Sequence, residues 1–525
     1  MPFPATRHEV RYGERIVRCF IERPANMNEM FLSAVHRAPD RVALVCGDLR
    51  VTYRELDEKV ERIARNLVHA GLKKGDRLAL LLGNGLEFVY AALAAARAGL
   101  ISVPMNIRQK LPEVEFVLNQ CTTSGIIYDA QYEANVPAGE AVPSLRHVYV
   151  VGEGLGEPFT SLYADCDAVA FPDVAEEDTF CLLYTSGTTG KPKGAMLTHV
   201  STIHTLLHYQ SGFDLAEGAV AMLAVPASHV TGFVAIILTT IRVAGTTVIQ
   251  REFKARQFLE LASREKINFT VVVPAIYNLL LLDPDFSSFD LSAWRVAGFG
   301  GAAMPEATID KLAKALPNLI LCNVYGSTET SSPVTIMPLG DIRKAPSSVG
   351  KVLPCADIIV VDDEGREVPA GQSGELLIGG AFVVPGYWDN PAGTKAGFTM
   401  GYWVSGDIGS KDEEGYVYVF DRKKDMINRA GFKVYCIEVE STLAHMPGLI
   451  ESAVVGKPDP VLGERVHAFI YSDGTLSDEG VIRSFCSERL SDYKVPDGVT
   501  FLKEPLPRNA NGKVLKNALR ALIAD

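Results

Sequence analysis

Residues 184–194 read Tyr184-Thr185-Ser186-Gly187-Thr188-Thr189-Gly190-Lys191-Pro192-Lys193-Gly194. The segment holds four serine and threonine hydroxyls, three glycines and two lysines, and it lies between the apolar runs 181–183 and 195–197. Glycine lets the backbone approach a ligand and present consecutive N–H groups to it, and hydroxyl and ammonium groups add hydrogen-bond donors. The segment therefore predicts a phosphate-binding loop between two buried strands.

The P-loop of nucleotide hydrolases is the first alternative for such a segment. That loop requires Gly-x-x-x-x-Gly-Lys-Ser/Thr, whereas Thr185 stands five residues before Gly190 and Pro192 follows Lys191. Proline also disfavours the helix that a P-loop opens. A flexible surface loop rich in serine and glycine is the second alternative, and paired lysines between two apolar runs argue against it.

Composition narrows the class of protein. A chain of 525 residues is too long for one core and predicts two or three domains. The net charge of −12 argues against general nucleic-acid binding, which needs a basic face. Nine cysteines without a Cys-x-x-Cys pair indicate reduced thiols and a cytoplasmic protein. No uncharged apolar stretch reaches the roughly 18 residues of a membrane span, so we expect no integral membrane contact.

Hydrophobic periodicity predicts an α/β fold. Apolar residues at Leu56, Val60, Ile63, Ala64 and Leu67 have helical spacing, and short apolar runs then alternate with helical segments as far as residue 273. This alternation predicts layered α/β subdomains with largely parallel sheets. From residue 358 the alternation of apolar and polar residues around glycines predicts a small antiparallel β subdomain, at about 345–422.

Four further motifs carry polar groups at places where strands end or loops begin. In open α/β sheets, ligands bind in crevices outside the carboxyl ends of strands. The second motif follows the apolar strand 319–321 and also predicts a helix N-cap at Ser327 or Thr328. The motifs are Gly300-Gly301-Ala302-Ala303-Met304-Pro305, Asn323-Val324-Tyr325-Gly326-Ser327-Thr328-Glu329-Thr330, Tyr402-Trp403-Val404-Ser405-Gly406-Asp407 and Pro507-Arg508-Asn509-Ala510-Asn511-Gly512-Lys513.

Together with residues 184–194, these motifs resemble those of the adenylate-forming superfamily, which contains acyl-CoA synthetases, adenylation domains and luciferases. The resemblance covers most of the chain in the family's order, and it is closest to aryl- or acyl-CoA ligases such as the 4-chlorobenzoate enzyme. It implies an acid–thiol ligase that uses ATP, Mg²⁺ and coenzyme A. The carboxylic acid reacts with ATP to give an acyl-adenylate and pyrophosphate, and the CoA thiol then displaces AMP.

The resemblance also implies roles for individual residues in nucleotide binding. Tyr325 stacks on adenine, Asp407 accepts hydrogen bonds from the ribose hydroxyls, and Glu329 and Thr188 hold the metal. The residues implied in ATP or AMP binding are Thr185, Ser186, Gly187, Thr188, Thr189, Gly190, Lys191, Lys193, Gly301, Ala302, Ala303, Asn323, Val324, Tyr325, Gly326, Ser327, Thr328, Asp407, Arg422 and Lys513.

Three residues are predicted to be catalytic: Lys513, His229 and Thr188. By resemblance, Lys513 reaches into the active site and bridges the substrate carboxylate and the α-phosphate. A cation between two reacting anions counters their repulsion and the charge that spreads through the transition state. A histidine in an apolar stretch is more often an ordinary core residue, but the position of His229 in the family pattern indicates a gate that orients the acid.

The resemblance implies that the C-terminal domain moves between the two half-reactions. It predicts an N-terminal ATP- and carboxylate-binding domain at 1–422 and a small α+β catalytic lid domain at 425–525, with the hinge at 423–424 and Lys424 as its pivot. Gly431 and Phe432 then approach CoA. Where the family usually has two adjacent glycines, this chain has Ala430 before Gly431.

The acid is predicted to be an apolar monocarboxylate, either aromatic or a short-to-medium aliphatic chain. Val324 stands where many fatty-acyl enzymes have glycine, and its added volume shortens or flattens the tunnel. No basic residue is evident among the predicted pocket residues to pair a second carboxylate. The predicted pocket residues are His229, Val230, Gly300, Val324, Gly326 and Ser331.

Two alternatives remain open at the level of sequence. One is an adenylation enzyme that loads its acyl group onto a carrier protein. The other is a non-catalytic nucleotide-binding regulator, against which the joint presence of Glu329, Asp407, Arg422 and Lys513 argues. A homodimer is expected only because proteins of this fold commonly form dimers.

Overall fold

The computed structural model describes residues 3–185, 191–302, 304–508 and 514–523. The chain divides into two compact units. Unit 1 comprises Met1–Met304, Thr308–Ile358 and Ile378–Val404, and unit 2 comprises Pro305–Ala307, Ile359–Leu377 and Ser405–Asp525. The hinge expected at 423–424 stays a prediction, because compactness alone does not identify the point about which a domain rotates.

Unit 1 contains a seven-stranded sheet in the order β11-β10-β6-β5-β7-β8-β9. All neighbouring pairs are parallel except β10 and β11, which form an antiparallel pair at the sheet edge. The strands are β5 (Arg77–Leu81), β6 (Ile101–Pro104), β7 (Gly125–Asp129), β8 (His147–Val151), β9 (Glu157–Pro158), β10 (Thr179–Thr185) and β11 (Lys193–Thr198).

A second run of strands in unit 1 has the order β18-β17-β16-β15-β14-β12-β13-β3-β4. Its centre, from β16 to β3, is parallel, which confirms the expected α/β layering. The strands are β3 (Val42–Cys46), β4 (Leu49–Thr52), β12 (Val220–Leu223), β13 (Thr246–Ile249), β14 (Phe269–Val272), β15 (Val296–Phe299), β16 (Ile320–Tyr325), β17 (Thr335–Ile336) and β18 (Gly350–Val352).

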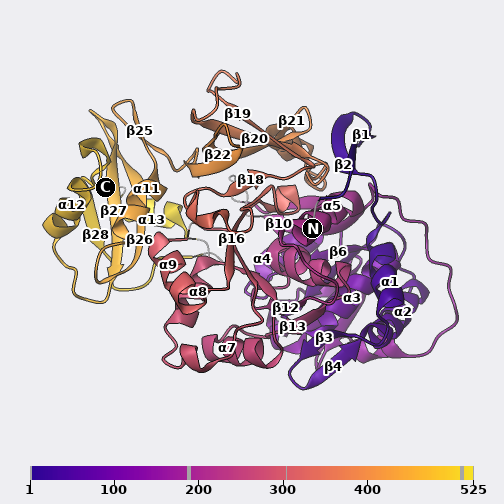
Figure 1. Cartoon of the computed structure of the whole chain (residues 1–525). Coiled ribbons are helices and arrows are strands. Elements are labelled where there is room, and N and C mark those ends of the chain that lie inside the picture. Colours follow the sequence, from indigo (N-terminus) through magenta and orange to yellow (C-terminus); the bar gives the residue numbers. More distant parts are fainter. Residues whose placement is uncertain (1–2, 186–190, 303, 509–513, 524–525) are drawn as a thin grey trace. The chain divides into compact units, whose positions relative to one another are not determined.

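Helices cover these sheets, and α2 shows why the periodicity predicted them. Thr52 and Glu55 form a reciprocal capping box at its start, and the five predicted apolar residues from Leu56 to Leu67 are all buried. Helices α1, α2 and α3 pack together (Figure 1). The helices of unit 1 are α1 (Met27–Arg37), α2 (Tyr53–His69), α3 (Leu86–Arg97), α4 (Leu111–Gln120), α5 (His199–Gly212), α6 (Thr239–Arg242), α7 (Ala255–Arg264), α8 (Pro274–Leu281), α9 (Glu306–Ala315) and α10 (Pro391–Gly397).

An antiparallel hairpin precedes these elements. Strands β1 (Thr6–Arg11) and β2 (Arg15–Phe20) pair from Thr6–Phe20 to Arg11–Arg15, and Figure 1 shows them in indigo beside the label of α5. The turn contains Tyr12 at a φ of 51° and Gly13 at 79°. A bulky residue in the left-handed region is strained, so contacts elsewhere must hold the turn in this shape.

Unit 2 has two β regions, and the first of them overlaps the antiparallel β subdomain that the sequence predicts at about 345–422. The first has the strand order β19-β20-β22-β23, and the second, a C-terminal sheet, has the order β25-β24-β27-β26 with β28 against β27. Helices α11 and α12 pack on that sheet over a core that includes Val439, Val454 and Ile482. The elements are β19 (Ala356–Val361), β20 (Gly374–Gly380), β22 (Tyr402–Lys411), β23 (Tyr416–Arg422), β24 (Ile427–Arg429), β25 (Phe432–Val434), α11 (Cys436–Leu443), β26 (Leu449–Asp459), β27 (Gly463–Ser472), α12 (Glu479–Ser487), β28 (Gly498–Phe501) and α13 (Lys516–Ala521). The short strand β21 (Phe398–Thr399) pairs with the start of β22 and belongs to unit 1.

One strand differs from its sequence-based prediction. The apolar run 319–321 was expected to end before Asn323, but β16 continues to Tyr325. Val324 and Tyr325 pair with Ile336 and Thr335 of β17, so backbone pairing extends the strand beyond the apolar run. The predicted N-cap at Ser327 is confirmed, since it caps the short 3₁₀ helix Thr328–Thr330.

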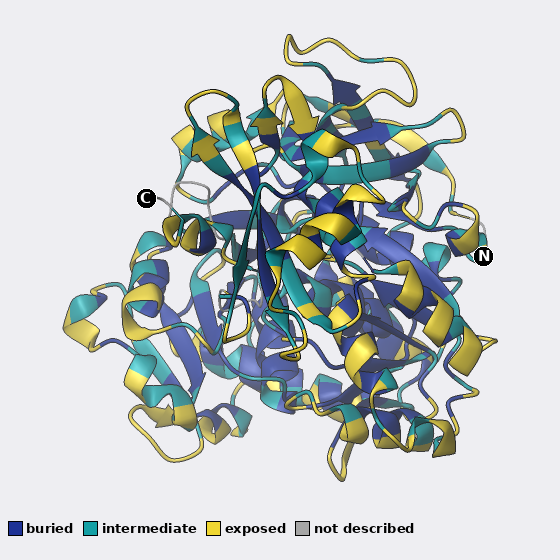
Figure 2. Cartoon of the chain, turned by 90° about the vertical axis from the view of Figure 1, so that its left-hand side faces the viewer, coloured by how far each residue is buried: buried dark blue, intermediate teal, exposed yellow. Residues whose placement is uncertain are grey.

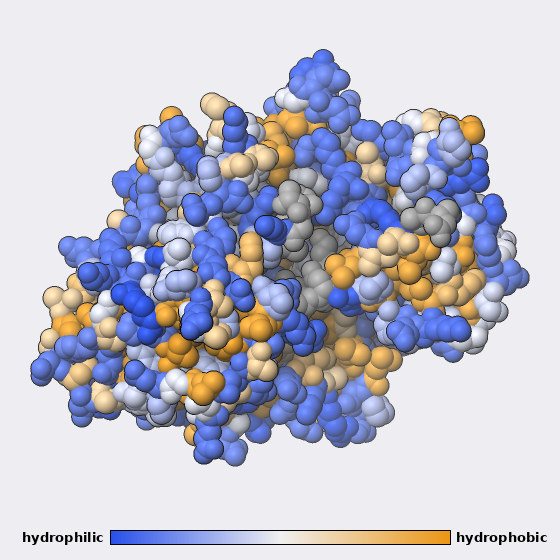
Figure 3. All heavy atoms as spheres, turned by 180° about the vertical axis from the view of Figure 1, so that it is seen from behind, coloured by the Kyte–Doolittle hydropathy of each residue, from blue (hydrophilic) through white to orange (hydrophobic). Residues whose placement is uncertain are grey.

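Burial follows the layers of the fold. In Figure 2 most strands are buried, and exposed residues lie on the outer faces of helices and in loops. Figure 3 shows one face on which hydrophilic side chains predominate, with smaller apolar groups between them. No helix within the described ranges is long and apolar enough to cross a membrane. All nine cysteines are free thiols.

Candidate active site

The predicted phosphate loop joins two antiparallel strands. Strand β10 ends at Thr185 and β11 begins at Lys193, and these two residues pair across the ladder. The flanking side chains Leu182 and Leu183 are buried, as expected for strands of a sheet core. The loop therefore emerges from the end of a rigid hairpin, with Thr185 and Lys193 at its base.

Glu329 lies next to the base of this loop. Its Oε1 accepts hydrogen bonds from the Tyr387 hydroxyl at 2.9 Å and from Thr185 Oγ1 at 3.3 Å, and its Oε2 accepts one from Ser327 Oγ at 2.6 Å. The residue is 6% exposed. Three hydroxyls therefore surround a buried carboxylate.

The surroundings of Glu329 suit a magnesium ion that arrives with a nucleotide. Mg²⁺ in ATP sites is commonly held by one or two carboxylates together with phosphate oxygens and waters. The described part of the chain has no cluster of three or more His, Cys, Asp or Glu that could form an all-protein cage. A single buried carboxylate with oriented oxygens fits the phosphate-bound arrangement, in which Glu329 would supply one ligand and neutralise charge.

A short extended segment, Val384-Pro385-Gly386-Tyr387-Trp388, continues the sheet beyond β11. Tyr387 bridges Ala195, the Met196 N–H donates to the Gly386 carbonyl at 3.1 Å, and the Trp388 N–H donates to the Gly194 carbonyl at 2.8 Å. Lys193 Nζ lies 5.0 Å from the centroid of the Tyr387 ring. This 384–388 segment thus places Tyr387 between Lys193 and Glu329.

Close backbone packing brings two other predicted regions together. A Cβ added at Gly300 would lie 2.3 Å from the Val324 carbonyl oxygen, so only glycine fits there. Gly300 follows β15, and Val324 lies in the neighbouring strand β16 and is buried. Gly301 has a φ of +76° and, like Ala302, is exposed. Gly300 and Val324 therefore pack directly against each other at the ends of neighbouring strands.

Ser331, one of the predicted pocket residues, does not lie on an open pocket wall. It is fully buried, adopts a left-handed φ of 51°, and donates from Oγ to Ser201 Oγ of α5 at 3.1 Å. Helix α5 also packs against the π-helix Thr231–Leu238. The predicted pocket residues around Ser331 and those around His229 thus share α5 as support.

His229 stands two residues before the start of that π-helix. Its carbonyl accepts the Phe233 N–H at 2.8 Å, so it begins the helical segment, and Val230 beside it is buried. Burial lowers the pKa of His229 below its ordinary value, because the imidazolium loses hydration. His229 is therefore neutral at pH 7. π-helical turns occur frequently at functional sites.

In unit 2, Asp407 and Arg422 form an ion pair. They lie opposite each other on β22 and β23, and Arg422 Nε is 2.8 Å from Asp407 Oδ1. Asp407 is 4% exposed, and its N–H donates to Ser405 Oγ at 2.9 Å. The Arg422 side chain also donates to the Ser405 carbonyl at 3.0 Å. The pair gives Asp407 a fixed orientation, and Lys424 follows it on an exposed turn.

The predicted CoA-facing residues form the turn of a β hairpin. Ala430 and Gly431 connect β24 to β25 with φ angles of 51° and 89°. This two-residue turn explains why two glycines suit the site, since both positions need a positive φ. The Gly431 N–H donates to Asn428 Oδ1 at 3.0 Å, and the exposed Phe432 ring stacks on Tyr493 with centroids 4.7 Å apart.

Several predicted site residues lie outside the described residues. They are Ser186, Gly187, Thr188, Thr189, Gly190, Ala303 and Lys513. Sequence reasoning also missed Tyr387, which contacts Glu329, and Arg15, which donates to the Val384 and Pro385 carbonyls of the 384–388 segment. No local signal marks them, because Tyr387 is 58 positions from Glu329 and Arg15 is 369 positions from Val384.

Two family models match this chain. The AMP-binding enzyme family matches residues 31–388, and the C-terminal domain of AMP-binding enzymes matches residues 438–513. Long-chain-fatty-acid–CoA ligase FadD13 of Mycobacterium tuberculosis is 35% identical over 477 residues, which is 90% of this chain and 93% of that protein. Feruloyl-CoA synthase of Amycolatopsis sp is 32% identical, over 92% of this chain and 96% of that protein.

A carrier-protein enzyme is also among the relatives. Fatty acid–[acyl-carrier-protein] ligase ScoC of Streptomyces coeruleorubidus is 34% identical over 92% of this chain and 93% of that protein. Among solved structures, the anthranilate CoA ligase AuaEII in complex with anthranoyl-AMP superposes with a TM-score of 0.88 at 27% identity, over 96% of this chain and 98% of the other.

The predicted cofactors are confirmed by these likenesses. The o-succinylbenzoate coenzyme A synthetase MenE of Bacillus subtilis, solved with ATP and a magnesium ion, has a TM-score of 0.84 and 26% identity over 94% of this chain and 99% of the other. The chain uses ATP, Mg²⁺ and coenzyme A. It belongs to the AMP-binding enzyme family, and it is an AMP-forming carboxylate–CoA ligase.

Proposed function

We propose that the acid activated by this ligase is an apolar monocarboxylate, aromatic or short-to-medium aliphatic. One observation carries the proposal. The predicted pocket residues offer only uncharged groups: apolar Val230 and Val324, glycines at 300 and 326, and a neutral His229. A second carboxylate would be desolvated there without a cation, which is costly.

The close packing around Gly300, Val324 and Gly326 supports a flat or short acid. Val324 is 6% exposed, and its carbonyl oxygen occupies the space beside Gly300. A Cβ added at Gly326 would lie 3.0 Å from Pro333 Cα, so the chain is also tight on that side. A planar ring or a narrow chain fits beside such a wall, and the relatives include enzymes named for both fatty and aromatic acids.

We assign the following roles within the reaction. Glu329 supplies a carboxylate to Mg²⁺, Lys193 and the loop that it follows stabilise the pyrophosphate that leaves, and Asp407 holds the ribose. Lys513 places a positive charge between the carboxylate and the α-phosphate, which lowers the barrier to their reaction. Neutral His229 borders the acid and orients it, and the unit that carries Lys424 rotates between the two half-reactions.

AMP formation across a panel of carboxylic acids, with and without CoA, tests this assignment. We expect turnover with benzoate-type and short-to-medium aliphatic acids, and release of AMP that depends on CoA. Turnover of dicarboxylates alone would contradict the proposed acid class. Pyrophosphate exchange with no consumption of CoA, but with acylation of an added carrier protein, would favour the carrier-loading alternative.

A further inference from the structure

The residues that hold Glu329 in place are tied to an element outside the matched family region. The match begins at residue 31, and the hairpin β1–β2 precedes it. Within unit 1, however, Arg15 of this hairpin contacts the same 384–388 segment that carries Tyr387. A continuous set of contacts therefore runs from the hairpin to the carboxylate proposed as a magnesium ligand.

Arg15 makes the first link. Its Nη1 donates to the Val384 carbonyl at 3.0 Å, and its Nη2 donates to the Pro385 carbonyl at 2.8 Å. Two donors of one planar guanidinium fix both the position and the rotation of the segment. Burial lowers the pKa of Arg15, but an arginine remains charged at neutral pH.

Tyr387 makes the second link. The Val384 N–H donates to the backbone carbonyl of Glu329 at 3.0 Å, and the Tyr387 hydroxyl donates to Glu329 Oε1 at 2.9 Å. The same segment thus holds both the backbone and the carboxylate of one residue. Phe398 contacts both residues, since its ring centroid lies 5.6 Å from that of Tyr387 and 5.8 Å from the Arg15 guanidinium carbon.

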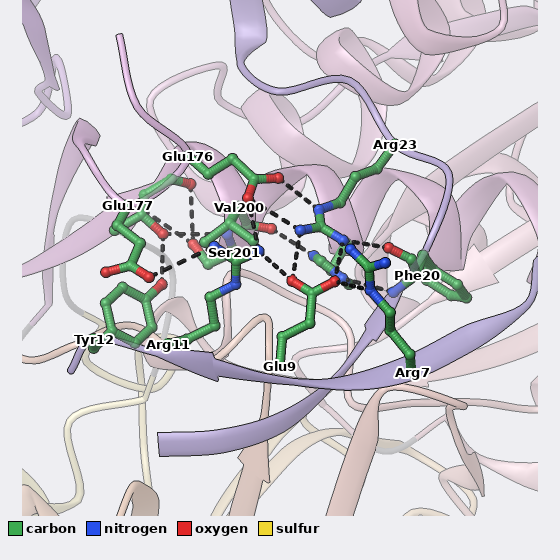
Figure 4. A network of polar contacts seen from close by, with 12 residues as sticks. Arg7, Glu9, Arg11, Tyr12, Phe20, Arg23, Glu176, Glu177, Val200 and Ser201 are labelled. Atoms are coloured by element: carbon green, nitrogen blue, oxygen red, sulfur yellow. Dashed lines mark hydrogen bonds and ion pairs between the residues drawn. The ribbon is translucent and has the colours of Figure 1, made fainter. Parts of the chain in front are cut away.

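The hairpin itself is anchored at three places. At its turn, the Tyr12 hydroxyl and Thr198 Oγ1 lie 2.7 Å apart, at the end of β11. At the last residue of β2, the Phe20 N–H donates to His204 Nε2 at 3.0 Å. At its base, Figure 4 shows Arg23 between Glu9 and Glu176, with separations of 2.8 Å and 2.6 Å. Such anchoring makes the hairpin a rigid support and not a loose extension.

We infer that Tyr387 is a positioning residue for Glu329 and that the hairpin, through Arg15, holds Tyr387 in register with the phosphate loop. The inference rests on the metal-binding role proposed above for Glu329. A hydrogen bond to one carboxylate oxygen orients the other toward the ion, and partners of this kind strongly influence metal affinity. The hairpin thereby sets how well the enzyme binds ATP together with Mg²⁺.

The test compares Tyr387→Phe and Arg15→Ala with matched controls. Tyr53→Phe also removes a buried hydroxyl, one that donates to the Gly245 carbonyl at 2.8 Å. Arg295→Ala also removes a guanidinium that donates to two adjacent carbonyls, those of Phe213 and Asp214. Both control residues are absent from the contacts that surround Glu329.

Two readouts are measured for each purified enzyme: calorimetric binding of ATP at increasing Mg²⁺ without acid, and the Mg²⁺ dependence of acyl-adenylate formation. We expect Tyr387→Phe to raise the half-saturating Mg²⁺ concentration by about tenfold. Arg15→Ala should cause a smaller rise, Arg15→Lys should restore part of it, and the double variant Arg15→Ala/Tyr387→Phe should be no worse than Tyr387→Phe. The controls should lower the melting temperature and leave the Mg²⁺ dependence unchanged.

Glu329→Gln separates failure of the inference from failure of the role on which it rests. If this variant alters the Mg²⁺ dependence while Tyr387→Phe does not, the positioning role is wrong and the ligand role stands. If Glu329→Gln leaves Mg²⁺ dependence unchanged, both are wrong. Effects of Arg15→Ala and Tyr387→Phe that simply add would overturn the link between hairpin and tyrosine.

Discussion

Three buried histidines on helix α5 make the stability of the protein depend on pH. His199, His204 and His208 are all buried, and burial lowers the pKa of His199 and His204 to about 4 and that of His208 well below its ordinary value. An unfolded histidine has a pKa of about 6.5. Between pH 6.5 and 4 the unfolded chain therefore binds protons that the native chain does not, and stability falls as the pH falls.

His208 provides a test at this scale. Neither ring nitrogen has a hydrogen-bond partner among the described residues, and the ring packs edge-on against Phe20 and Phe382. Replacing it by leucine removes a desolvated polar group, so we expect His208→Leu to raise the free energy of unfolding by about 1 kcal/mol at pH 7. Between pH 6.5 and 4, unfolding of this variant should take up one proton fewer, so its free energy of unfolding should fall less steeply with pH. Urea denaturation at several pH values measures this slope.

His204→Leu is the contrasting variant. His204 accepts the Phe20 N–H and lies 2.8 Å from the Val200 carbonyl, so its replacement leaves the buried Phe20 N–H without this acceptor and should destabilise the enzyme at pH 7. If the free energy of unfolding of His208→Leu falls with pH as steeply as that of the unaltered enzyme, His208 does not contribute to the pH dependence of stability.

At the scale of elements, charge fastens the hairpin β1–β2 to unit 1. Hydrogen bonding to Arg23, supported by Arg7 and Arg11, holds the pKa of Glu9 well below its ordinary value. A lowered carboxyl pKa contributes stability that is complete above the unfolded value of about 4.3 and is lost as the pH falls below it. Docking of the hairpin should therefore weaken in acid before the sheets of unit 1 open.

Glu9→Gln tests this element. We expect the amide protons of β1 and β2 to exchange with deuterium roughly tenfold faster at pH 7 in this variant, because Arg7, Arg11 and Arg23 each lose their ion pair with Glu9 and only Arg11 and Arg23 keep one with Glu176. Exchange in the distant strand β13 should not change. Glu22→Gln, at an exposed residue of the same region, is the matched control. Equal exchange in Glu9→Gln and the unaltered enzyme would show that the network does not fasten the hairpin.

At the scale of the whole molecule, the residues proposed for the reaction are divided between the two compact units. The nucleotide-binding candidates Thr185, Glu329 and Tyr325 belong to unit 1, whereas Asp407, Arg422 and Lys513 belong to unit 2. Chemistry that needs groups from both units can be switched by domain movement, and two half-reactions with different requirements give such movement a use.

Lys513→Ala separates the two half-reactions. We expect acyl-adenylate formation to fall by about 10²–10³-fold, the usual cost of removing one group that stabilises developing charge. Thioester formation from a supplied acyl-adenylate and CoA should keep most of its rate, because that step does not join two anions. Pyrophosphate exchange and CoA consumption measure the two steps. Equal losses in both, or adenylation that is left intact, would contradict the role of Lys513.

Local sequence patterns predicted much of the fold. The apolar spacing from Leu56 to Leu67 is the buried face of α2, and the apolar runs beside 184–194 are the strands β10 and β11. The end of β16 and the π-helix after Val230 were not predicted. Pairing with β17 extends the former, and π-helical geometry in the latter has no signature in an all-apolar run such as 232–238.

By itself, the sequence determined the fold class, the family and the chemical groups of the site, because these depend on residue types at short, ordered spacings. Tertiary structure alone decided which groups meet. Thr185 and Tyr387 both donate to the carboxylate of Glu329 although the three residues come from separate parts of the chain, and Arg15 holds that arrangement from a fourth part near the start of the sequence. The physical reason is that sheet pairing and burial bring distant residues within hydrogen-bond range, and no local pattern records such distances.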